Sequence, residues 1–65
     1  MATIKAWFEN KGHMTYYDYS YEEAFRLAKK EAIKRKCYAF SLESSRKGYE
    51  YFERAYPNGK NWRRI

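Results

Sequence analysis

Three alanines spaced four residues apart constrain the fold of this chain more than any other feature. Residues four apart lie on one face of an α-helix, so Ala24, Ala28 and Ala32 form a stripe of small side chains. Larger apolar side chains extend or flank this stripe (Tyr21, Phe25 and Leu27). Because small side chains allow close approach, the pattern predicts a helix over residues 20–36 that packs against a sheet.

The ends of this segment carry helix start and stop signals. Ser20 and Glu23 form a capping box, in which each side chain satisfies a free backbone N–H of the other residue. Two acidic residues in the first turn and Lys34, Arg35 and Lys36 in the last turn complement the helix dipole. These signals predict that the helix begins directly after Ser20.

Alternation of apolar and polar residues predicts strands on both sides of the helix. Gly12 is expected to supply a positive φ in the first hairpin turn, and Pro57 to Gly59 to form a later turn. The expected strands cover residues 3–9, 13–19, 38–43, 48–56 and, as a short last strand, 60–65. The sequence therefore predicts one α+β domain over residues 1–65, with the order ββαββ. Its single helix packs on one face of an antiparallel sheet of four strands, or of five if residues 60–65 pair.

The opposite face of the sheet is expected to combine aromatic rings with carboxylates. Strand alternation assigns to it Trp7, Tyr17 and Tyr19, together with Glu9, Glu43 and Glu50. An open aromatic face can stack nucleobases, whereas cross-strand ring pairs can simply hold a hairpin together. The carboxylates favour the second interpretation, because a polyanion avoids them.

A chain of 65 residues with one cysteine and one histidine has few means of stabilisation besides its core. Cys37 has no partner for a disulfide within the chain, and a structural zinc site needs about four ligands. Aromatic residues make up 22% of the sequence, so we expect an aromatic core. The free thiol and the absence of a signal-peptide pattern favour a cytoplasmic location, and no apolar run is long enough to cross a membrane.

Catalysis is disfavoured by the sequence. His13 has no Ser, Cys or Asp at a spacing that indicates a triad, and Cys37 follows the helix C-terminus, which does not lower a thiol pKa. Glu50 and Glu53 are expected to point to opposite faces of their strand. No constellation of residues meets the geometric roles of catalysis, so we expect a non-enzymatic protein without a cofactor or metal.

Basic charge is concentrated in the second part of the chain. Residues 1–25 carry two basic and four acidic side chains, whereas residues 26–65 carry twelve basic and four acidic ones. The candidate nucleic-acid-binding residues are Arg26, Lys29, Lys30 and Lys34 on the helix, Arg46 and Lys47 in a turn, and Lys60, Trp62, Arg63 and Arg64 near the C-terminus. Spread in this way, cations suit phosphate contact without base reading. A solvated helix face is the alternative interpretation.

Two functions are compatible with these features. The first is a basic nucleic-acid-binding module, for DNA or RNA, with limited sequence specificity. The second is a small effector of the phage or mobile-element type, which binds a host protein complex, for example through an acidic surface of it, and inhibits or modulates it. Sheet edges on so small a domain also allow a homodimer to form by strand pairing.

Overall fold

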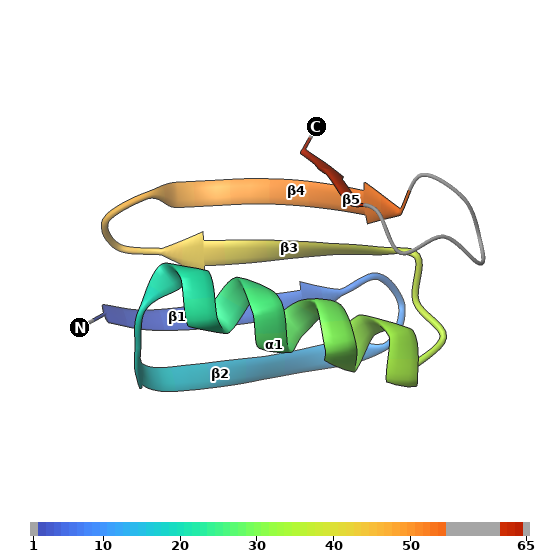
Figure 1. The fold of residues 1–65 in the computed structure, drawn as a ribbon, viewed down its shortest axis with the longest axis horizontal. Coiled ribbons are helices and arrows are strands. Elements are labelled where there is room, and N and C mark those ends of the chain that lie inside the picture. Colours follow the sequence, from blue (N-terminus) through green and yellow to red (C-terminus); the bar gives the residue numbers. More distant parts are fainter. Residues whose placement is uncertain (1, 55–61, 65) are drawn as a thin grey trace.

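The computed structural model describes residues 2–54 and 62–64. Its elements follow the order β1 (Ala2–Phe8), β2 (Gly12–Tyr19), α1 (Tyr21–Lys34), β3 (Ala39–Ser44), β4 (Gly48–Arg54) and β5 (Trp62–Arg64). The five strands form one antiparallel sheet in the order β2-β1-β3-β4-β5, and α1 lies across one face (Figure 1). This confirms the predicted ββαββ architecture, with a fifth strand. The predicted turn from Pro57 to Gly59 lies outside the described residues.

The helix begins as its sequence signals predict. The Ser20 hydroxyl accepts a hydrogen bond from the backbone N–H of Glu23 at 3.2 Å, and the Glu23 carboxylate accepts one from the Ser20 N–H at 3.2 Å. These contacts with Ser20 hold the pKa of Glu23 below its ordinary value. The alanine stripe is fully buried, since Ala24, Ala28 and Ala32 each have 0% of their surface exposed.

The core lies between α1 and the central strands. Ile4, Phe40 and Leu42 are its largest fully buried side chains. Phe52 joins them from β4, and its ring centre lies 4.6 Å from that of Phe25 on the helix. Full burial of one such side chain contributes about 1.5–3 kcal/mol, so a few rings supply much of the stability of a domain this small.

The helix covers only part of its side of the sheet. It packs on β1, β2 and β3, but no Cα atom of α1 lies within 8 Å of a Cα atom of β4 or β5. In Figure 1, β4 accordingly lies beyond the helix, next to β3, and β5 pairs with β4 at the edge of the sheet. The helix-side surface of these two strands therefore borders the flank of α1, and only helix side chains such as Phe25 reach it.

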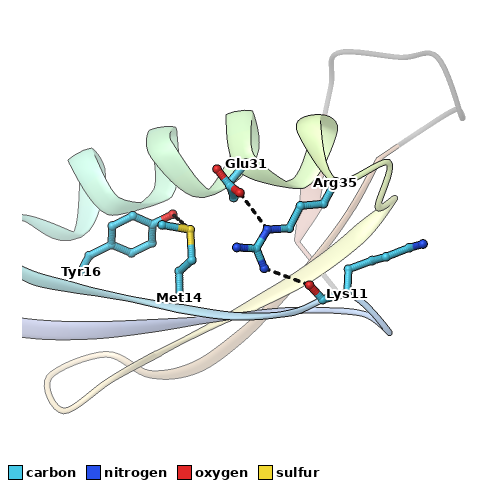
Figure 2. Close-up of polar contacts among 5 residues, drawn as sticks. All are labelled: Lys11, Met14, Tyr16, Glu31 and Arg35. Atoms are coloured by element: carbon cyan, nitrogen blue, oxygen red, sulfur yellow. Dashed lines mark hydrogen bonds and ion pairs between the residues drawn. The ribbon is translucent and has the colours of Figure 1, made fainter.

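Arg35 fastens the end of the helix to the first hairpin (Figure 2). Its Nε forms an ion pair with Glu31 at 2.7 Å, and its Nη1 donates to the backbone carbonyl of Lys11 at 2.9 Å. The guanidinium also lies 4.7 Å from the ring centre of Phe8. Gly12 adopts φ +89°, as predicted for the turn, and a Cβ there would lie only 3.3 Å from Nη1 of Arg35. Arg35 is thus a structural cation.

A β-bulge in β2 changes the face on which one tyrosine lies. Ile4 is opposite Tyr16, but Ala2 is opposite Tyr19, so β2 contains one extra residue between these pairs. Asp18 adopts φ +61° at this point. Tyr19 therefore lies on the helix side, where its ring makes an edge contact with Tyr16 at 5.9 Å between centres. The prediction that Tyr19 shares the open face with Tyr17 is wrong.

Candidate nucleic-acid interface

Cations and aromatic rings line the border between α1 and strands β4 and β5. We call this surface the basic–aromatic strip and define it by Lys29, Lys47, Arg54 and Arg64 with the rings of Tyr21, Phe25, Phe52 and Trp62. Strand register places its sheet residues on the helix side, because Phe52 is opposite the buried Phe40 and also opposite Arg64. Residues distant in sequence are thus brought together beside the helix, with Phe52 buried beneath them.

Two lysines of the strip are held against rings of the helix. The Nζ of Lys47 lies 4.6 Å from the ring centre of Tyr21, and the Nζ of Lys29 lies 4.6 Å from that of Phe25. At this distance an ammonium is attracted by the face of the ring, and its aliphatic stem covers apolar surface. The two charges are therefore oriented while Lys47 stays exposed and Lys29 stays half-buried.

Two arginines complete the strip on the sheet. The guanidinium carbon of Arg54 lies 4.5 Å from the ring centre of Tyr38 and 5.5 Å from that of Trp62. Arg54 also donates to the carbonyl of Cys37 at 3.2 Å. The Arg64 guanidinium lies 5.9 Å from the Phe52 ring centre, and 63% of its side chain is exposed. Arg64 therefore has most of its surface available to a partner.

Glu50 is the carboxylate that contacts the strip among the described residues. It accepts a hydrogen bond from the Tyr21 hydroxyl and forms an ion pair with the Nε of Arg64 at 3.2 Å. The prediction that Glu50 lies on the open face is wrong, because β4 pairs with β3 in a register that sets Glu50 opposite the buried Leu42. The strip thus has four cations against one carboxylate.

A pocket of about 340 Å³ opens at the start of the helix, next to the strip. It is lined by Ile4, Tyr19, Ser20, Tyr21, Ser44, Arg46 and Lys47. Ser44 shapes its basic side, since the Ser44 hydroxyl accepts from the backbone N–H groups of Arg46 at 3.1 Å and Lys47 at 3.4 Å. Its volume is in the range of small-ligand sites, and it combines an apolar floor with two cations.

The structure describes nine of the ten predicted site residues, and it places them in different surroundings. Arg26, Lys30 and Lys34 are exposed on the back of the helix, as predicted. Lys29, Lys47, Trp62 and Arg64 belong to the strip, and Arg46 adjoins it through the pocket. Arg63 is paired with Glu53 and so has a side chain on the opposite face of the sheet from Arg64. Lys60 lies outside the described residues.

The surroundings of Trp62 and Arg54 differ most from those that the sequence predicted. Trp62 was predicted as a binding residue. Its ring packs against Phe40 in an edge contact, with 4.9 Å between ring centres, which indicates that it also stabilises the core. Arg54 was not among the predicted site residues. Its position two residues after Phe52 places both on one face of β4, so strand alternation alone was a signal for it.

The open face of the sheet has a mixed character. Trp7 donates to Glu43 through Nε1 at 3.3 Å, and Tyr51 donates to Glu9 at 2.8 Å. This bond to Glu9 raises the pKa of Tyr51 to about 12. Tyr17 and Tyr49 are the most exposed large hydrophobic side chains among the described residues, at 69% and 64%. Two carboxylates here, Glu9 and Glu43, accept hydrogen bonds from aromatic side chains, and the face is not dominated by cations.

Other kinds of site have little support in the described part of the chain. Within residues 2–54 and 62–64, no group of three or more His, Cys, Asp or Glu side chains is placed to hold a metal ion. The helix in this part of the chain is too short and too polar to cross a membrane. Cys37 is buried, and its thiol donates to the carbonyl of Ala39 at 2.7 Å.

Comparison with known proteins finds no match for this chain among family models, curated proteins or solved structures. The chemistry of its surfaces is therefore the basis for a functional proposal.

Proposed function

We propose that this chain is a non-enzymatic nucleic-acid-binding module that contacts phosphates through the basic–aromatic strip and the exposed back of α1. The observation that carries the proposal is the arrangement of four strip cations on aromatic rings against a single carboxylate. Phosphate contacts by Lys and Arg supply most of the affinity of non-specific nucleic-acid binding.

The geometry favours binding of the backbone over reading of the bases. Because Lys29 and Lys47 rest on rings, they need little further ordering when a phosphate arrives. Lys29 also connects the strip to the cations on the back of the helix, so a polyanion could follow both surfaces together. Sequence reading requires side chains directed at base edges in a groove, and phosphate contacts alone carry no sequence information. We therefore expect limited sequence specificity.

The pocket beside the strip offers a place for one unstacked nucleotide. Tyr19 and Tyr21 supply rings at its sides, and Ile4 supplies an apolar surface, while Arg46 and Lys47 supply positive charge. Stacking of a base on such rings contributes about 1–3 kcal/mol and tolerates any base. This feature favours single strands or strand ends over the interior of a duplex.

The decisive measurement is binding of labelled single-stranded DNA and RNA by fluorescence anisotropy over a series of salt concentrations. The double variant Lys29→Gln/Lys47→Gln should lower the slope of log affinity against log salt by about 1.4–1.8, since each lost phosphate contact removes about 0.7–0.9. The matched control is Lys5→Gln/Lys11→Gln, which removes the same charge from a side chain held over Trp7 and from the first hairpin turn.

The control variant should retain the slope of the wild type. If wild-type protein forms no complex with either nucleic acid at low salt, the proposed function is wrong. If the slope falls equally in both double variants, binding responds to net charge alone, and the strip is not the binding surface.

A second candidate function is favoured by the open face. An effector that binds a host protein complex would use exposed rings, and Trp7, Tyr17 and Tyr49 are all at least 40% exposed. Trp and Tyr are enriched among the residues that dominate protein interfaces. Affinity capture from a nuclease-treated lysate should then recover a stoichiometric protein with the wild type, and lose it with Tyr49→Ala but not with Lys29→Gln/Lys47→Gln.

A further inference from the structure

The two edges of the sheet differ in how they are protected. In the described part of the chain, β5 is an edge strand of three residues, and two of them are Arg63 and Arg64. β2, at the other edge, has eight residues and contains no Asp, Glu, Lys or Arg from Gly12 to Tyr17. An edge strand presents unpaired backbone N–H and C=O groups, and proteins usually blunt it by short length or by charge. The β5 edge is blunted in both ways, and the β2 edge is not.

We propose that β2 pairs antiparallel with β2 of a second copy of this chain, across a two-fold axis at Thr15. The dimer would contain one continuous sheet with ten strands, five from each copy. A two-fold axis perpendicular to the sheet keeps the helices of both copies on the same side. This proposal does not depend on the proposed function.

The side chains of β2 complement each other in this register. On the open face, Thr15 lies opposite Thr15 of the partner subunit, and His13 lies opposite Tyr17 of the partner subunit. On the helix side, Met14 meets Tyr16 of the partner subunit. Aromatic pairs, Thr–Thr pairs and sulfur–aromatic contacts all stabilise neighbouring strands. His13 also lies 5.2 Å from Trp7 between ring centres, so the pairing would extend an existing row of rings across the interface.

Charge favours the same edge. The chain carries a formal net charge of +6, so two copies repel each other over most orientations. The sheet order places β4 and β5, with the basic–aromatic strip, at the opposite end from β2. Pairing through β2 keeps the two strips apart, whereas pairing through β5 would bring Arg63 and Arg64 of both copies together. The neutral edge is therefore the one at which like charges interfere least.

Two-fold symmetry explains why such pairing would stop at a dimer, and the bulge limits its length. An interface with two-fold symmetry uses the same patch on both copies, and here it consumes both β2 edges. The remaining edges are the short, charged β5 strands. Asp18, with its φ of +61°, interrupts the ladder after Tyr17 and so confines the pairing to the neutral segment.

Sedimentation velocity over a range of protein concentrations tests the proposal with a matched pair of variants. Tyr17→Lys and Tyr49→Lys each replace an exposed tyrosine of the open face by the same cation, but only Tyr17 lies on β2. We expect the wild type and Tyr49→Lys to dimerise equally. Tyr17→Lys should weaken the dimer about tenfold or more, because it removes two ring pairs and adds two positive charges at the interface.

A cysteine at the axis tests the register. Antiparallel partners have Cα atoms about 4.5–5.5 Å apart, which suits a disulfide, so Thr15→Cys should oxidise readily to a covalent dimer. Tyr49→Cys is the control for an exposed thiol away from the edge. The proposal is overturned if the wild type sediments as a monomer at every concentration, or if Thr15→Cys cross-links no faster than Tyr49→Cys.

Discussion

The two faces of the sheet use similar residue types to opposite effect. On the helix side, the rings of the basic–aromatic strip carry Lys29, Lys47 and Arg64, and Glu50 is the carboxylate that contacts this strip. On the open side, rings remain exposed and their polar atoms bind carboxylates, as Tyr51 does with Glu9. Composition alone therefore does not predict where a basic surface lies, because the strand register distributes the charges.

Strand alternation is the physical origin of this difference. In β4, Phe52 and Arg54 point to the helix side, while Tyr51 and Glu53 point to the open side. Adjacent residues thus supply the basic strip and the mixed face in turn. The excess of cations produces a positive potential at the basic–aromatic strip, because Glu50 is the one carboxylate among the described residues that contacts it.

The largest expected difference between the faces is in stability. Phe40→Ala, in the core beneath the helix, should cost about 3–5 kcal/mol, which is comparable to the whole stability of a domain this size. Trp7→Ala, on the open face, should cost roughly half of that or less, since 40% of Trp7 is already exposed. Urea denaturation followed by circular dichroism measures both, and Phe40→Leu gives a milder core variant. Equal losses from the two faces would contradict the comparison.

A smaller effect is expected where the helix starts. Ser20→Ala removes the cap and should lower the free energy of unfolding by about 1 kcal/mol. The Ser20 contacts lower the pKa of Glu23, so the part of this stability that belongs to the carboxylate is present above its unfolded pKa and is lost as pH falls through the lowered value. Denaturation at neutral and acidic pH should show a smaller difference between the two proteins in acid. If the difference in free energy of unfolding is the same at both pH values, the Glu23 carboxylate does not contribute to the cap.

Local signals explain why the helix and its covered face were predictable. The capping box, the alanine spacing and the dipole-compatible charges all lie within one segment, so residues 20–36 predicted the helix to within two residues at each end. The same reasoning predicted correctly that Arg26, Lys30 and Lys34 point to solvent. These features depend on neighbours in the sequence.

The predictions that were wrong or incomplete depend on how the strands pair. Tyr19 changes face because of a bulge at Asp18, whose position depends on how β2 pairs with β1. Glu50 lies on the helix side because β4 pairs with β3 in a particular register. Arg54 joins Tyr38 and Trp62 through the tertiary arrangement of three segments. Alternation within one strand gives relative faces, but it does not specify which face is covered.

Substitution of Glu50 tests the difference in charge between the basic–aromatic strip and the open face. Glu50→Gln keeps an acceptor for the Tyr21 hydroxyl but frees Arg64 from its ion pair, so affinity for single-stranded DNA should rise about two- to fivefold at low salt. Glu43→Gln makes the same change on the open face and keeps an acceptor for Trp7. It should leave the affinity unchanged when measured by anisotropy. An equal rise in both variants would mean that the polyanion does not distinguish the two faces.

The smallest effect expected is a titration on the open face. Because the Tyr51 hydroxyl donates a hydrogen bond to Glu9, the pKa of Tyr51 is raised to about 12, and this bond stabilises the fold below the ordinary tyrosine pKa of about 10. That contribution is lost as pH rises through the folded-state value. The difference between the ultraviolet titrations of wild type and Tyr51→Phe isolates this one phenol among eight tyrosines. A difference curve centred near the ordinary value would show that Glu9 does not hold Tyr51 in solution, and Glu9→Gln should move the curve toward that value.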